Sequence, residues 1–164
     1  MTWLTSYQQR VVSAEEALRV VQSGQRVYIG GGCAVPQSLL DALVARAPEL
    51  HDVETISILH MGDAPYAAPE VRAHFRHNAM FIGSNVRQAV NEGRADFTPI
   101  FLSEIPALFH KGQLPIDVCL IQLGPPDEHG FCSFGVEVGV TKPAAQAART
   151  VIAEIDDRMP RVLG

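Results

Sequence analysis

Short β-rich segments alternate with helical segments along almost the whole of this 164-residue chain. The alternation is clearest near its start, where the β-rich residues 26–29 run into three glycines and Pro36 then precedes a leucine-rich helical face. The sequence contains no internal repeat. Apolar runs at 53–59 and 116–123 have the length and composition of buried strands. Such alternation predicts a three-layer α/β fold, with a mostly parallel sheet covered by helices on both faces.

The remaining segments follow the same alternation. Further strands are expected at residues 79–82, 97–102 and 150–155, of which 97–102 should be an edge strand or an extended segment because it contains Pro99. Helices are expected at residues 13–24, 36–44, 69–75, 84–92, 103–112 and 143–148. The first of these begins with the S-x-x-E pattern of a capping box at Ser13.

Composition excludes several classes of protein. The chain is 47% hydrophobic and 19% charged, as folded proteins are, and its net charge of -5 argues against broad nucleic-acid binding. No apolar run approaches the ~18 residues of a membrane span, and residues 1–10 lack the features of a signal peptide. The three cysteines, Cys33, Cys119 and Cys132, form no paired spacing, so we expect neither a disulfide framework nor a zinc site. A reducing cytoplasm is the simplest location.

The glycine run at residues 30–32 is the first candidate for chemistry. Glycines after a strand allow a ligand to approach the backbone closely, and amides at the start of the next helix favour an anion or a carbonyl oxygen. The spacing matches neither a dinucleotide fingerprint nor a phosphate-binding P-loop. A tight strand-to-helix turn is the alternative interpretation.

The loop at residues 124–135 is the second candidate. It follows the most apolar of the expected strands, and ligands of open α/β sheets bind beyond the carboxyl ends of strands. An acid pair (Asp127 and Glu128), a histidine (His129) and a serine (Ser133) lie there. The alternative is a solvated loop shaped by proline and glycine.

Other catalytic arrangements find less support. Cys33 has no histidine near it in the sequence, and a small buried cysteine is the commoner case. His74 and His77 could share one face of a helix and bind a metal. No carboxylate or cysteine spacing supports such a site, so we expect a solvated surface pair. Ser133 lacks the G-x-S-x-G elbow of hydrolases.

Four segments together resemble the N-terminal domain of the acetyl-CoA hydrolase/CoA-transferase family, of the 4-hydroxybutyrate CoA-transferase-like kind. They are the glycine loop, residues 97–106, residues 125–135 and residues 153–160. The third, P-P-D-E-H-G-F-C-S-F-G, is close to the family's S-P-x-D-x-x-G-x-x-S-x-G and is the most specific. The sequence departs from the family at Pro125, where serine is common, and at Asp156, where asparagine is common.

The resemblance implies a CoA-transferase type of fold and transfer of coenzyme A between carboxylates. A glutamate of the family's C-terminal domain forms a mixed anhydride and then a glutamyl-CoA thioester. We therefore expect residues 1–164 to be the N-terminal domain without that catalytic half, and no residue of this chain to be catalytic. Glu104, Glu128 and Glu154 should not inherit the role. The expected cofactor is coenzyme A, as an acyl-CoA substrate, with no metal.

In that setting the two loops would border one cleft for the acyl group and the carboxylate. The residues expected to line it are Gly31, Gly32, Cys33, Ala34, Asp127, Glu128, His129 and Ser133. The expected partners are acyl-CoA, a small carboxylate and either a C-terminal half or a second copy, with Phe131, Phe134 and Val136 as apolar anchors. A thioester hydrolase of the same family is one alternative function. A non-catalytic remnant that binds a carboxylate or a partner protein is another.

Overall fold

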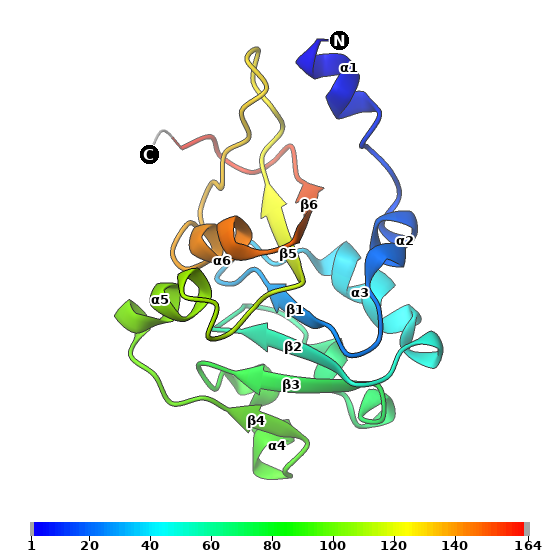
Figure 1. The fold of residues 1–164 in the computed structure, drawn as a ribbon, viewed down its shortest axis with the longest axis vertical. Helices are drawn as coiled ribbons and strands as arrows, with labels where there is room; N and C mark the ends of the chain where they lie inside the picture. Colours follow the sequence, from blue (N-terminus) through cyan, green and yellow to red (C-terminus); the bar gives the residue numbers. More distant parts are fainter. Residues whose placement is uncertain (1, 163–164) are drawn as a thin grey trace.

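A six-stranded, all-parallel sheet forms the centre of the molecule in the computed structural model, which describes residues 2–162 (Figure 1). The strand order is β4-β3-β2-β1-β5-β6. The strands are β1 (Arg26–Ile29), β2 (Val53–Ser57), β3 (Phe75–Ala79), β4 (Ala95–Phe97), β5 (Val118–Leu123) and β6 (Thr150–Ile155). The α-helices are α1 (Trp3–Gln8), α2 (Ala14–Ala17), α3 (Gln37–Ala45), α4 (Ser84–Asn91), α5 (Ile105–His110) and α6 (Thr141–Ala147). The predicted α/β fold class is confirmed.

The strand order reverses beside β1. From β1 the chain adds β2, β3 and β4 outward to one edge, and it then returns to place β5 and β6 on the other side of β1. Val27 of β1 accordingly pairs with Thr55 of β2 and with Val118 of β5. In open α/β sheets the loops that leave such a reversal point form the ligand-binding crevice. Here those loops are the glycine loop after β1 and the long loop after β5.

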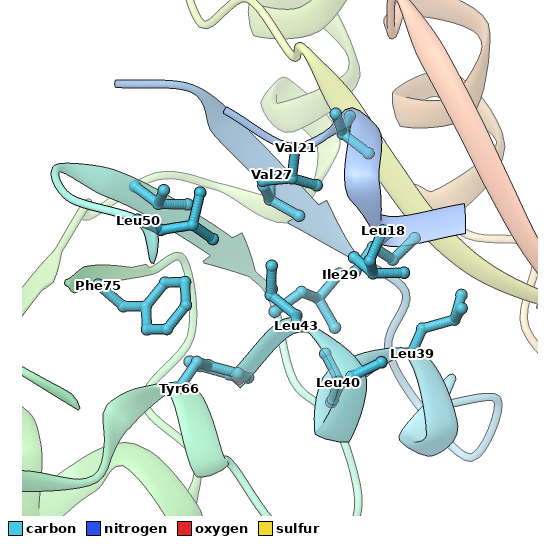
Figure 2. Close-up of a cluster of buried hydrophobic side chains, with 14 of the residues drawn as sticks. Leu18, Val21, Val27, Ile29, Leu39, Leu40, Leu43, Leu50, Tyr66 and Phe75 are labelled. Atoms are coloured by element: carbon cyan, nitrogen blue, oxygen red, sulfur yellow. The ribbon is translucent and has the colours of Figure 1, made fainter. Parts of the chain in front are cut away.

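Helices cover both faces of the sheet and bury two separate apolar clusters. On one face, α3 and the segment before β1 pack over Val27 and Ile29, and Figure 2 shows Leu18, Leu40 and Leu43 in this cluster. On the other face, α5 and α6 pack over Tyr28 between those two residues. Adjacent residues of a strand point to opposite faces, so β1 must be apolar at nearly every position. Fully burying each such side chain contributes about 1.5–3 kcal/mol.

The third strand lies earlier in the chain than the sequence predicts. We expected a helix at 69–75 and a strand at 79–82, whereas a 3-10 turn occupies Pro69–Val71 and β3 spans Phe75–Ala79. The sequence of β3 contains several polar residues, so it lacks the apolar pattern by which a strand is predicted. Neighbouring strands supply the hydrogen-bonding and ionic partners of these polar residues. Arg76 forms an ion pair with Asp96 of β4. The buried His77 shares a hydrogen bond with Thr55 of β2, with 3.0 Å between His77 Nδ1 and Thr55 Oγ1. The expected solvated His74–His77 pair on a helix is therefore wrong.

Other boundaries also differ from the predictions. The helix expected at 13–24 is shorter in the structure, because α2 ends at Ala17 and a 3-10 turn then spans Leu18–Val20. The edge strand is β4 (Ala95–Phe97), which ends before Pro99 instead of containing it. Ser13 caps α2 as predicted, because its hydroxyl accepts the backbone N–H of Glu16 at 3.2 Å. The N-terminal α1 was not predicted. Its Trp3 indole N–H donates to the carbonyl of Glu128 at 3.0 Å, and Figure 1 shows the loop after β5 rising from the sheet on the same side as α1. None of the helices described over residues 2–162 has both the length and the apolar character to cross a membrane.

Candidate functional site

A cavity of about 430 Å³ lies at the carboxyl ends of β1 and β2. This volume falls within the ~300–1,000 Å³ of typical small-molecule sites. The residues that line it are Tyr28, Gly31, Gly32, Ile58, Leu59, Leu102, Pro106, Glu137, Gly139 and Val140. They come from the glycine loop, the end of β2, the start of α5 and the segment before α6, so both loops at the strand-order reversal contribute to this cavity.

Backbone hydrogen bonds hold the glycine loop against the segment that follows β2. Gly32 donates its N–H to the carbonyl of Leu59 at 2.7 Å, and Met61 donates to the carbonyl of Gly32 at 2.8 Å. A Cβ atom on Gly31 would lie 2.6 Å from the Leu59 carbonyl oxygen. Gly32 has a φ of 59°, which L side chains rarely adopt. Close approach at Gly31 and backbone conformation at Gly32 thus explain why glycine occupies both positions.

The residues of this loop that were predicted to contact a ligand differ in whether their backbone N–H groups are free. Among residues 2–162, the backbone N–H groups of Gly31 and Cys33 donate to no internal acceptor, which leaves both for an oxygen of a ligand. The N–H of Ala34 already donates to Gly31 at 3.2 Å, and the methyl group of Ala34 is buried. Cys33 is exposed, so the expectation of a buried cysteine there is wrong.

Glu137 is the cavity residue that the sequence interpretation missed. Its half-buried carboxylate lies over Gly32 and Gly139, and a Cβ atom on Gly139 would be 2.8 Å from its Oε1. Burial raises the pKa of Glu137 above its usual range. The available signal was its position as the single acidic residue within the apolar run Val136–Val140.

Asp127 shapes the turn of the loop after β5. Its Oδ1 accepts the backbone N–H groups of His129 at 2.9 Å and Phe131 at 2.8 Å, and its Oδ2 pairs with Arg161. The Phe131 N–H is the main cause that holds the pKa of Asp127 below its usual range. These contacts engage both carboxylate oxygens within the chain. They are the pattern of an Asx-type turn, in which the aspartate replaces a backbone acceptor.

Ser133 is buried and links the same loop to Val162, near the C-terminal end of the described residues. Its hydroxyl accepts the N–H of Gly135 at 3.1 Å and that of Val162 at 3.0 Å. Glu128 and His129 extend into solvent at the tip, with side chains 86% and 70% exposed.

Four of the eight predicted residues line a cavity and fall into two separate ones, whereas Cys33, Ala34, Glu128 and His129 line neither. Gly31 and Gly32 line the larger one, whereas Asp127 and Ser133 line a separate cavity of about 240 Å³. Within the part of the chain that the structure describes, the expected single cleft is not formed. Their contacts with a ligand stay a prediction.

No group of three or more histidine, cysteine, aspartate or glutamate side chains among residues 2–162 is placed to hold a metal ion. Cys33, Cys119 and Cys132 are all free thiols. The arrangement instead leaves a free N–H group on Gly31, which lines the larger cavity, and another on the nearby Cys33, and such donors are suited to binding a carbonyl or carboxylate oxygen.

A sequence model of the acetyl-CoA hydrolase/transferase N-terminal domain matches residues 1–164. The chain belongs to this family. Within the family it is 43% identical, over its whole length, to a 4-hydroxybutyrate coenzyme A transferase of Clostridium kluyveri. It is 40% identical over 154 residues to a succinyl-CoA:acetate/propanoyl-CoA:succinate CoA transferase of Fasciola hepatica. The chain spans 38% and 32% of the lengths of these two relatives.

Solved structures of other proteins share the fold over almost the whole chain. A 4-hydroxybutyrate CoA-transferase from Porphyromonas gingivalis matches with a TM-score of 0.82 and 34% identity, over 99% of this chain and 37% of that one. RipA from Yersinia pestis matches with a TM-score of 0.92 and 25% identity, over 100% of this chain and 40% of that one. The resemblance seen in the sequence and its CoA-transferase fold are thereby confirmed.

Proposed function

We propose that residues 1–164 form the acyl and carboxylate side of the active site of an acyl-CoA:carboxylate CoA-transferase. The glutamate that carries CoA lies outside these residues, in a C-terminal half. The observation that carries this proposal is the cavity beside the glycine loop, in a chain that matches the N-terminal part of CoA-transferases. The substrates are an acyl-CoA and a small carboxylate, with coenzyme A as the group transferred and no resident metal.

The proposed reaction exchanges CoA through covalent intermediates on that glutamate. Its carboxylate attacks the thioester carbonyl and displaces CoA thiolate, which forms a mixed anhydride. The thiolate attacks the glutamyl carbonyl of the anhydride, releases the first carboxylate and leaves glutamyl-CoA. An acceptor carboxylate then reverses these two steps and departs as the new acyl-CoA.

Residues of this chain bind and orient the acyl group in that scheme. The free N–H groups of Gly31 and Cys33 stabilise negative charge on an acyl oxygen. The apolar side chains of Ile58, Leu59 and Leu102 surround the acyl tail and limit access of water to the anhydride. The loop at 127–133 contributes indirectly, through the shape of the segment that leads to Glu137.

The three glutamates that were predicted not to be catalytic, Glu104, Glu128 and Glu154, lie outside the lining of the larger cavity. Glu154 accepts the N–H of Leu39 at 3.3 Å and the Gln122 side-chain amide at 3.1 Å, so both of its oxygens are used in the fold. Glu104 is exposed in a 3-10 turn before α5, and Glu128 is at the exposed loop tip. This distribution supports a nucleophile supplied from elsewhere.

Thioester hydrolysis is the second candidate, and the family itself includes acetyl-CoA hydrolases by its description. The specific observation in its favour is that Leu102, on the cavity wall, is 65% exposed, so water has a route to a bound thioester. A C-terminal half that covers Leu102 would favour transfer over hydrolysis.

Exposed apolar residues support association with such a half or with a second copy. Phe131 is 68% and Val136 is 55% exposed, whereas Phe134 is partly buried and packs against the apolar cluster around Tyr28. A location in the cytoplasm remains part of this proposal. Purified residues 1–164, incubated with acetyl-CoA and succinate, should show no exchange of CoA above a blank. Turnover that disappears when one of the chain's own glutamates is changed to glutamine would contradict the proposal.

A further inference from the structure

The cavity beside the glycine loop holds one carboxyl group in otherwise apolar surroundings. Ile58, Leu59, Leu102 and Val140 supply aliphatic walls, while Glu137 supplies the acid. The lining contains no lysine, arginine or histidine. A charged group at such a site changes which ligands fit, because its interactions are stronger away from bulk water.

Two glycines leave the space that the Glu137 side chain occupies. Its carboxylate occupies the space that Cβ atoms on Gly32 and Gly139 would fill. Gly32 belongs to the loop proposed to bind the acyl oxygen, so the carboxylate lies at the same wall as that loop. Any acyl group bound against Gly31 and Gly32 therefore extends within reach of Glu137.

No cation of the described chain neutralises this carboxylate. The ion pairs formed among residues 2–162 involve other acidic residues, and the Glu137 side chain takes part in none of their side-chain hydrogen bonds. The other polar side chain of the lining, Tyr28, uses its hydroxyl in an interaction with Thr141 Oγ1 at 3.4 Å. The acceptor oxygens of Glu137 are consequently free to meet a ligand.

We infer that Glu137 makes the cavity select acyl groups that lack a second carboxylate, and favours a tail that is neutral or carries a hydroxyl group. This inference rests on the proposed acyl-binding function of the cavity. A tail hydroxyl donates to Glu137 in a charge-assisted hydrogen bond, whereas a tail carboxylate meets a like charge at short range. The names of related enzymes include hydroxy, unsubstituted and dicarboxylic acyl groups, so membership of the family does not decide this choice.

The test measures binding of three small thioesters to the 164-residue chain. The probes are N-acetylcysteamine thioesters of butyrate, 4-hydroxybutyrate and succinate at pH 8, followed by the backbone amide NMR signals of Gly31 and Gly139. We expect the butyryl and 4-hydroxybutyryl probes to bind about tenfold more tightly than the succinyl probe. Glu137→Gln, which keeps the shape of the side chain, should remove this preference, and Glu137→Asp, which keeps the charge, should retain it.

Glu70→Gln is the matched control, because Glu70 is exposed and outside both cavities. It should leave all three affinities unchanged. Binding of the three probes with equal affinity, before and after Glu137→Gln, would overturn the role of Glu137 and leave the acyl site standing. Signals that do not move with any probe would overturn the acyl site itself and this inference with it.

Discussion

The carboxylate of Glu154, near the end of β6, accepts the backbone N–H of Leu39 in the first turn of α3 at 3.3 Å. The two residues are 115 positions apart in the chain. The first N–H groups of a helix have no partner within it, so a carboxylate there satisfies a donor and interacts favourably with the helix dipole. This contact joins the last strand to the helix that follows the glycine loop. The helix after the glycine loop is thus fixed to the edge strand β6.

Replacing Glu154 should therefore weaken the fold. Glu154→Ala removes the acceptor at Leu39 and also the one for Gln122, and we expect a loss of about 1–2 kcal/mol in the free energy of unfolding. Urea denaturation followed by circular dichroism measures it. Glu70→Ala, at an exposed position, is the control and should change stability by less than about 0.5 kcal/mol. Equal stability of the two variants would show that the contact contributes nothing.

The glycine loop should reject a side chain at Gly31. Its Cβ atom would meet the carbonyl oxygen of Leu59 at 2.6 Å, so the backbone must shift. Gly31→Ala is expected to destabilise the chain by about 1–3 kcal/mol, the usual range for overpacking. The comparison is Gly124→Ala, whose Cβ atom would lie at least 3.6 Å from its neighbours. Thermal unfolding of both variants decides the point, and the prediction fails if Gly31→Ala is the more stable of the two.

Much of the sheet was predictable because β1 and β5, which lie side by side in it, are apolar at nearly every position. In β1, Val27 and Ile29 pack on one face of the sheet and Tyr28 packs on the other. The strand is therefore a continuous apolar run, which is distinct from the alternating pattern of an amphipathic strand or helix. The strand β3 escaped prediction because the partners of Arg76 and His77 come from neighbouring strands. Sequence patterns record local periodicity, and they do not record which polar residues the fold will pair.

The candidate site was predicted in part for the same reason. A glycine run after a strand is a local signal, and Gly31 and Gly32 do line the cavity. Glu137 was missed because it lies 105 residues from Gly32 in the sequence. The two residues come together only because β1 and β5, the strands that precede their loops, are neighbours in the sheet. Asp127 gave a strong motif signal, yet its oxygens close a turn of the backbone. Motif strength alone does not separate residues that shape a loop from residues that meet a ligand.

Acidic pH should destabilise the fold through His77. Burial, reinforced by the nearby His60, lowers the pKa of His77 to about 3, and its Nε2 has no partner. The unfolded chain binds a proton at this residue with a pKa of about 6.5, so the unfolded state holds more protons below that pH. Its contribution to stability is complete above pH 6.5 and is lost as the pH falls toward 3. We expect a loss of about 2 kcal/mol by pH 5 from this group.

The variant His77→Asn isolates that effect. Asparagine can keep a hydrogen bond to Thr55, which bonds His77 at 3.0 Å, but it does not titrate. The free energy of unfolding of His77→Asn should therefore fall less steeply between pH 7 and pH 5 than that of the unchanged chain. The same slope in both proteins would mean that other groups cause the acid sensitivity.

The cysteines should differ widely in reactivity. Cys33 is exposed, whereas burial raises the pKa of the Cys119 thiol to about 12. Thiolates are the reactive form, so iodoacetamide at pH 8 should modify Cys33 first and leave Cys119 protected until the chain unfolds. Mass spectrometry of timed samples checks the order. Because Cys33 is exposed, Cys33→Ala should cost less than about 0.5 kcal/mol, and early labelling of Cys119 would contradict the structure.

The central claim is that this chain supplies the acyl side of a CoA-transferase. The most direct measurement uses a chimera in which residues 1–164 replace the matching N-terminal part of the Clostridium kluyveri transferase, to which they are 43% identical. CoA exchange between acetyl-CoA and 4-hydroxybutyrate is then followed by chromatography. We predict exchange by the chimera, none by residues 1–164 alone, and at least about a 100-fold loss with Gly31→Val in the chimera. A folded chimera without exchange, or full activity with Gly31→Val, would contradict the account.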